Sequence, residues 1–135
     1  VIFILALPFE TSGWIVLVLS FLLGIGIDSF SSTIGMHSSA CIIMAFCRTY
    51  LLKMVAPRGG YEFNAKPSLQ DMGLNWYLFY AFVLVFIHHL ALFFLESFKF
   101  TQFFHTTWRA IASSVFTFVL ILVVQLFNYE SSTKS

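Results

Sequence analysis

Charged residues are scarce in this sequence. They make up 10% of the 135 residues, whereas hydrophobic residues make up 59%. A soluble domain carries roughly a quarter charged residues, and a small globule has too much surface to hide so much apolar material. The composition therefore excludes an ordinary soluble domain and indicates a membrane protein.

Clustered basic residues and paired cysteines are also missing. The net charge is +1, and the seven Lys and Arg residues are scattered along the chain, which argues against a nucleic-acid-binding surface. Cys41 and Cys47 lie six residues apart in an apolar segment, so a helix would place them on opposite faces. We expect buried thiols, and neither a disulfide nor a zinc site is supported.

Catalytic signatures are absent from the sequence as well. It contains no HExxH, no GxSxG, no phosphate-binding loop and no acidic pair arranged for metal or acid–base chemistry. We therefore expect a protein that is not an enzyme and that holds no cofactor or metal. An intramembrane enzyme that uses Asp28 and the histidines is an alternative, and it requires these side chains to converge on one point.

Long apolar runs dominate what is present. Four of them reach or approach the ~20 residues that a membrane span needs: residues 14–27, about 34–54, 74–95 and 106–129. Residues 1–7 form a shorter run, which we interpret as the end of a helix cut by the beginning of the chain. The predicted fold is an all-α, polytopic transmembrane helical bundle with four whole spans plus a partial N-terminal one. We expect residues 1–135 to be a single integral membrane domain that lacks its N-terminal helix or helices.

The distribution of Lys and Arg predicts the orientation of these spans. The only long polar stretch, residues 56–73, is interpreted as a loop between spans. With alternating sides, five Lys and Arg residues share the side of this loop and two lie opposite. Cytoplasmic loops carry an excess of Lys and Arg. We therefore expect a multi-pass protein of the cytoplasmic (inner) membrane, with the loop and the C-terminus in the cytoplasm and Asp28 and His37 near the outer face.

Small and polar residues form a stripe in the run that begins at residue 14. Ser20, Gly24 and Asp28 are spaced i, i+4 and i+8, so they share one helix face. Small residues let another helix approach closely. This face is predicted to be a packing seam in which Asp28 ends the helix, and the alternative is a carboxylate that binds an ion, a proton or a cation of a partner.

His37 and Arg48 share one face of the next run, about 16 Å apart along the axis at 1.5 Å per residue. They are too far apart to bond each other, so each is expected to find a partner on another helix or among lipid headgroups. Gly35 is expected to let the chain turn tightly into this helix. The segment from Asp28 to His37 is thus predicted to be a re-entry turn between two spans.

The remaining polar residues lie in the last two runs. His88 and His89 are neighbours that point about 100° apart on a helix, so we expect one to be hydrogen-bonded in the bundle and the other to face lipid or a partner protein. His89 and Glu96 share a face two turns apart, which would make a polar track toward the outer surface. A stripe in the last run is predicted to join helices: Arg109, Ser113, Thr117, Gln125 and Asn128.

The run LPFETSGW…FLLGIGIDSFSSTIGMHSSACIIMAFCR resembles the MreD family of bacterial rod shape-determining proteins. The shared pattern is a glycine-bearing helix that ends in Asp, a Ser-rich turn, then Gly and His, and a small-residue helix that ends in Arg. In this sequence the pattern comprises Gly24, Gly26, Asp28, Gly35, His37 and Arg48. The segments YLLKMVAPRGGYE, DMGLNWYLFYA and VFIHHLALFFLE also look like one branch of the family. The family usually has five or six spans.

The resemblance implies a non-catalytic integral membrane component of the cell-wall elongation complex, which regulates rod cell shape. The implied partners are a bitopic MreC-like protein and, through it, an MreB-like actin homologue and peptidoglycan synthesis enzymes. In this hypothesis Ser20 and Gly24 form the seam for the partner helix. Asp28, His37 and Arg48 would then make polar contacts that fix the partner helix in place.

A second hypothesis follows from the same family. Its helix arrangement is similar to that of the substrate-binding membrane subunits of energy-coupling-factor transporters. A small-molecule binder of that kind would need an enclosed cavity lined by polar residues such as Asn75, His89 and Gln125.

Overall fold

The computed structural model describes residues 1–97 and 103–133, and the regular secondary structure in these ranges is helical. The long helices, in chain order, are α2 (Gly13–Ser31), α3 (Met36–Met54), α5 (Leu74–Ser97) and α6 (Phe103–Thr133). Two single-turn helices, α1 (Ile2–Leu5) and α4 (Leu69–Met72), precede α2 and α5. The predicted all-helical fold class is confirmed.

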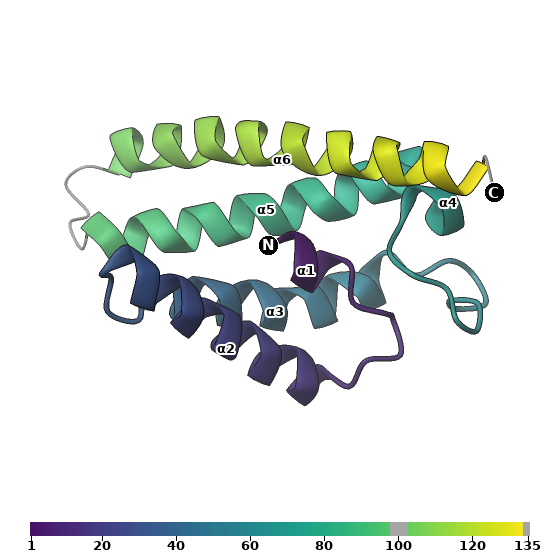
Figure 1. The fold of residues 1–135 in the computed structure, drawn as a ribbon, viewed down its shortest axis with the longest axis horizontal. Helices are drawn as coiled ribbons and strands as arrows, with labels where there is room; N and C mark the ends of the chain where they lie inside the picture. Colours follow the sequence, from purple (N-terminus) through teal and green to yellow (C-terminus); the bar gives the residue numbers. More distant parts are fainter. Residues whose placement is uncertain (98–102, 134–135) are drawn as a thin grey trace.

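The long helices lie side by side in the order α2, α3, α5, α6 (Figure 1). Each packs against the next, so that α6 lies at one edge and α2 at the other. The turn between α2 and α3 lies at the same end of the bundle as the end of α5 and the start of α6. The loop before α4 lies at the opposite end, near the C-terminus (Figure 1).

Among the described residues, three helical segments are long and apolar enough to cross a membrane: Gly13–Ser31, Leu74–Glu96 and Thr107–Ser131. They indicate a membrane protein. Helix α3 has the same length as α2, 19 residues, but Arg48 and Lys53 make it less apolar. The composition of α3 therefore does not show the fourth whole span that the sequence predicted.

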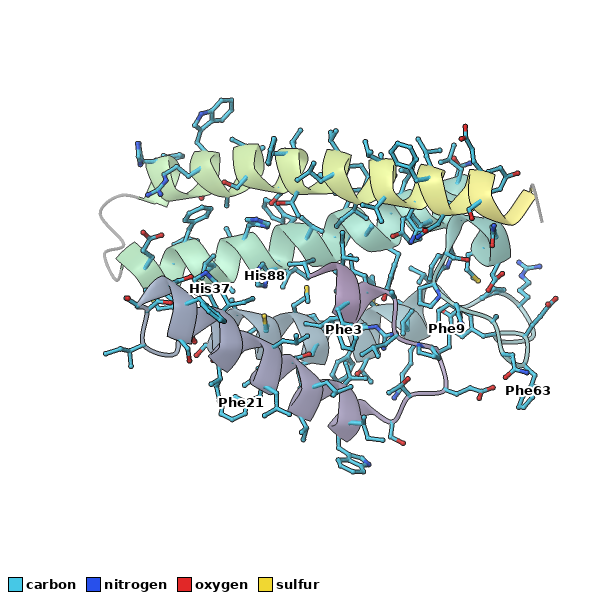
Figure 2. All side chains as sticks on the ribbon, in the orientation of Figure 1. Phe3, Phe9, Phe21, His37, Phe63 and His88 are labelled. Atoms are coloured by element: carbon cyan, nitrogen blue, oxygen red, sulfur yellow. The ribbon has the colours of Figure 1, made fainter. Side chains whose placement is uncertain are left out.

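The core lies where α3 faces α5, with α1 and α2 adding side chains to it. Its fully buried members include Val16, Met44, Ala45, Tyr80, Ala81, Leu84 and Val85. The outward faces are also apolar, as in Phe21, which points away from the bundle on α2 (Figure 2). An apolar outer face suits helices that are surrounded by lipid rather than by water.

The connection between α3 and α5 is tied to the ends of both helices. Tyr61 Oη donates a hydrogen bond to the carbonyl oxygen of Leu52 at 2.6 Å, and Trp76 Nε1 donates one to that of Val55 at 2.9 Å. Phe9 stacks on Tyr61 with the ring centroids 3.9 Å apart. The hydrogen bonds tie the 56–73 loop and α5 to the end of α3, and the ring stacking joins the turn before α2 to the loop.

The 56–73 loop contains one helical turn that the sequence analysis did not predict. Ser68 caps α4, because its Oγ accepts a hydrogen bond from the backbone N–H of Asp71 at 3.2 Å. The Ser-x-x-Asp spacing in this segment is a recognisable start signal for a helix.

Candidate functional site: the turn between α2 and α3 and the buried arginine

Asp28, near the end of α2, binds the beginning of α3. Its Oδ1 accepts a hydrogen bond from the backbone N–H of His37 at 3.0 Å, and its Oδ2 accepts one from that of Ser38 at 3.1 Å. The hydroxyl of Ser38 donates to Oδ2 at 2.7 Å, and that of Thr33 donates to Oδ1 at 2.7 Å. Both carboxylate oxygens of this buried side chain therefore have partners within the chain.

This arrangement compensates for a missing helix cap. Gly35 occupies the N-cap position of α3 and has no side chain to offer. The first N–H groups of a helix lack intrahelical partners, and they favour a negative charge nearby. Asp28 supplies that charge from the preceding helix. Gly35 itself has a φ of 74°, a left-handed conformation that suits glycine, which confirms the tight turn predicted there.

His37 completes the cluster. Its Nδ1 lies 3.0 Å from Asp28 Oδ1 and 3.0 Å from Thr33 Oγ1. The Thr33 hydroxyl lies beside the imidazole, but it donates its proton to the carboxylate, as the Ser38 hydroxyl does. Neither proton is therefore positioned for removal by His37, as activation of a nucleophile would require. The geometry is that of a hydrogen-bonded helix cap, and it matches the predicted re-entry turn.

Gly24 lies against the backbone of α3. A Cβ placed on Gly24 would lie 2.2 Å from Ser38 Cα and 2.7 Å from Ser38 N. Ser20 is fully buried one turn earlier, and its Oγ donates to the carbonyl oxygen of Val16 at 2.7 Å. The packing seam predicted from this stripe is present, and α3 of the same chain occupies it.

The seam at Ser20 and Gly24, which was predicted to receive a partner helix, is filled by α3 in this structure. A partner helix cannot lie where the backbone of α3 already makes contact. The polar contacts expected from Asp28 and His37 are likewise directed at the start of α3. The sequence showed a seam but not which helix fills it.

Gly26 differs from Gly24 in its surroundings. It lies on the exposed side of α2, and a Cβ placed there would have no neighbour within 4 Å. Exposed apolar side chains surround it on the helix surface, among them Leu22, Leu23 and Phe30. Gly26 belongs to the family-like pattern, but its position makes no packing contact with the described part of the chain.

Arg48 is buried in the bundle, with 2% of its surface exposed. Its Nε donates to Tyr80 Oη on α5 at 2.9 Å, and its Nη2 donates to the backbone carbonyl of Leu7. Tyr80 Oη in turn donates to the carbonyl oxygen of Leu5 at 3.1 Å. The prediction that Arg48 finds partners on other segments is confirmed by these bonds, which lie within the chain.

The two adjacent histidines of α5 point to different helices. His89 Nε2 lies 3.2 Å from Thr117 Oγ1 on α6, and its Nδ1 lies 2.9 Å from the carbonyl oxygen of Val85. His88 is buried on the side of α5 that faces α2 and α3 (Figure 2). One histidine is hydrogen-bonded as predicted, but His88 does not face lipid, because α3 covers that side of α5.

Glu96 was predicted to continue a polar track from His89 along α5. Glu96 is exposed near the end of α5. Arg109 is exposed on α6, and its guanidinium carbon lies 4.7 Å from the centre of the Phe93 ring. The predicted joining stripe on α6 is confirmed at Thr117, whose hydroxyl lies within hydrogen-bond distance of His89 on α5.

Three members of this site were missed by the sequence analysis: Thr33, Ser38 and Tyr80. Thr33 and Ser38 flank the Gly35 turn, and hydroxyl residues next to a glycine N-cap were an available signal. Tyr80 carried no signal, because its link to Arg48 spans 32 residues of sequence.

The described residues hold no group of three or more His, Cys, Asp or Glu side chains that could bind a metal ion. No protein-family model matches the chain, and comparisons with curated proteins and with solved structures gave no match. The geometry above is thus the direct basis for a functional proposal.

Proposed function

We propose that this chain is a non-catalytic scaffold of the cytoplasmic membrane that binds the transmembrane helix of a bitopic partner protein. In this proposal α3 also crosses the membrane, in addition to α2, α5 and α6. The 56–73 loop and the C-terminus lie in the cytoplasm. The resemblance to the MreD family supports an MreC-like partner and a role in cell-wall elongation and rod cell shape.

The observation that carries the proposal is the contrast between Gly24 and Gly26 of α2. Gly24 is covered by the backbone of α3, whereas Gly26 lies on an exposed apolar face with nothing within 4 Å of its Cβ position. A glycine costs helix stability and exposes backbone. In a membrane span, such a site permits close approach of another helix, and association in lipid depends on close packing.

The polar residues of the turn support a structural role rather than catalysis. The Asp28 carboxylate accepts bonds on both oxygens, and Arg48 is held by Tyr80 and Leu7. Groups engaged in this way fix the relative positions of α2, α3 and α5. They present a rigid outer face of α2 to a partner.

The test is co-purification from native cells in mild detergent, with partners identified by mass spectrometry. We expect the wild-type chain to recover a single-span MreC-like protein. Gly26→Leu should reduce that recovery at least fivefold while leaving the chain inserted and folded. Ala112→Leu is the matched control, because Ala112 is also a small exposed residue but lies on α6.

Equal recovery with Gly26→Leu and with the wild type would remove the α2 face from the proposal. Recovery of paired ATPase subunits in place of a single-span protein would contradict the scaffold and favour the transporter subunit. The pockets described in the structure are not lined by Asn75, His89 or Gln125. The arrangement thus gives the transporter alternative no specific support.

A further inference from the structure

A pocket opens beside Arg48, at the end of the bundle where α2 begins and α3 ends. Its volume is about 410 Å³. Both charged residues that line it, Arg48 and Lys53, are cations, and hydroxyl groups come from Thr11, Thr49 and Tyr61. The Tyr61 and Thr49 hydroxyls already donate to the backbone carbonyls of Leu52 and Ala45. The positive charge of Arg48 and Lys53 is therefore the feature of this opening that would attract a ligand.

The guanidinium of Arg48 donates to two neutral acceptors in the described chain, the Tyr80 hydroxyl and the Leu7 carbonyl. Within residues 1–97 and 103–133, no carboxylate oxygen lies within 4.0 Å of it. Arginine stays charged in proteins, and a charge removed from water is costly unless it is paired. A buried arginine that lines an open pocket without a counter-charge calls for an anionic ligand.

The planar shape of the Arg48 guanidinium favours phosphate as the ligand. A guanidinium presents donors in a planar fork that matches phosphate oxygens, and a lysine adds a second positive charge. Gly13 also lines the pocket, and it is the first residue of the 19-residue helix α2, whose N-cap Ser12 makes no side-chain cap bond. The free N–H groups of such a helix start add to the attraction.

The position of the pocket favours a lipid as the source of that phosphate. It lies at the end of an apolar helix bundle, next to the start of the membrane-spanning segment Gly13–Ser31. Phe9 and Leu52 provide apolar wall beside the cations. A phospholipid offers both a phosphate for the cations and a glycerol–acyl portion for the apolar wall.

We propose that this pocket binds the phosphate of an anionic phospholipid, with Arg48 and Lys53 as the charged contacts. This inference depends on the placement of the chain in a membrane and is independent of the scaffold function. Loss of partner recovery and loss of lipid binding would therefore be separate results.

The test uses the purified full chain in mild detergent, with lipid binding followed by native mass spectrometry and by thermal stability. Phosphatidylglycerol is compared with phosphatidylcholine and with inorganic phosphate. We expect phosphatidylglycerol to bind in preference to phosphatidylcholine. Lys53→Gln should weaken phosphatidylglycerol binding about fivefold, as loss of one basic contact to an anionic lipid implies.

Lys53 is exposed, so its replacement leaves the fold intact and keeps the test interpretable. Lys66→Gln is the matched control, because it removes an equal charge from an exposed position outside the pocket. Equal binding of phosphatidylglycerol and phosphatidylcholine would overturn the proposal. An unchanged affinity in Lys53→Gln, or equal stabilisation by inorganic phosphate alone, would overturn it as well.

Discussion

Replacing Gly24 with alanine tests the packing of α2 on α3 directly. The new Cβ would lie 2.2 Å from Ser38 Cα, whereas ordinary contact begins at 3.4 Å, so α3 would have to move by about 1.2 Å, the difference between these distances. The obstructing atoms belong to the backbone of α3, which cannot rotate away as a side chain can. A second close atom, Ser38 N at 2.7 Å, blocks the same direction.

The same displacement weakens the helix cap. The hydrogen bond from Ser38 N to Asp28 Oδ2 is 3.1 Å long, and it joins the two helices that must separate. Overpacking costs about 1–3 kcal/mol, and loss of one hydrogen bond to a charged group costs about 1.5–3 kcal/mol. The gain in helix propensity from Gly to Ala offsets roughly 1 kcal/mol of this. We expect Gly24→Ala to lower the free energy of unfolding by about 2–4 kcal/mol.

The assay is equilibrium unfolding in detergent micelles, followed by circular dichroism. Gly26→Ala is the matched control, because the same change in the same helix meets no atom within 4 Å. We expect the control to be as stable as the wild type or slightly more stable. If Gly24→Ala unfolds at the same denaturant concentration as Gly26→Ala, the close contact between α2 and α3 is refuted.

Two further predictions concern the turn and the loop. Asp28→Asn removes the charge and turns an amide N–H₂ toward donors on His37 or Ser38. We therefore expect it to lower the free energy of unfolding by about 3 kcal/mol. A value within about 0.5 kcal/mol of wild type in the same assay would show that the carboxylate does not cap α3. Burial raises the pKa of Tyr61 above its ordinary value of 10.0. The folded chain then keeps this phenol proton at a pH where the unfolded chain releases it, so the resulting stability is complete below about pH 10 and is lost as the pH rises through the folded pKa. Unfolding measured from pH 9 to 11 should therefore decline less steeply for Tyr61→Phe than for wild type, and identical slopes would contradict this contribution.

Local sequence patterns were sufficient to predict much of the fold. The scarcity of charge and the apolar runs predicted helices of membrane-spanning character, and three segments have that length and composition. The i, i+4, i+8 stripe on α2 correctly placed Ser20, Gly24 and Asp28 on one buried face. Such periodicities depend only on helix geometry, so they can be read without knowledge of neighbouring segments.

The partners of these residues could not be read in the same way. The stripe was assigned to an external helix, but α3 fills it. Arg48 was known to need a partner, but Tyr80 was not identified. Helix boundaries were clear where composition changed sharply and less clear at α4, where a single capped turn interrupts a polar loop.

The sequence by itself determined that the chain forms apolar helices and that Gly35 permits the turn between two of them. It placed the end of α2 at Asp28, whereas the helix continues to Ser31. These properties follow from side-chain chemistry and backbone conformation within a few residues. Only the tertiary structure decided that Gly24 contacts α3, that Gly26 is left exposed, and that Arg48 is buried beside an open pocket. Those outcomes depend on how the helices pack, which brings together residues that are distant in sequence and that no local pattern connects.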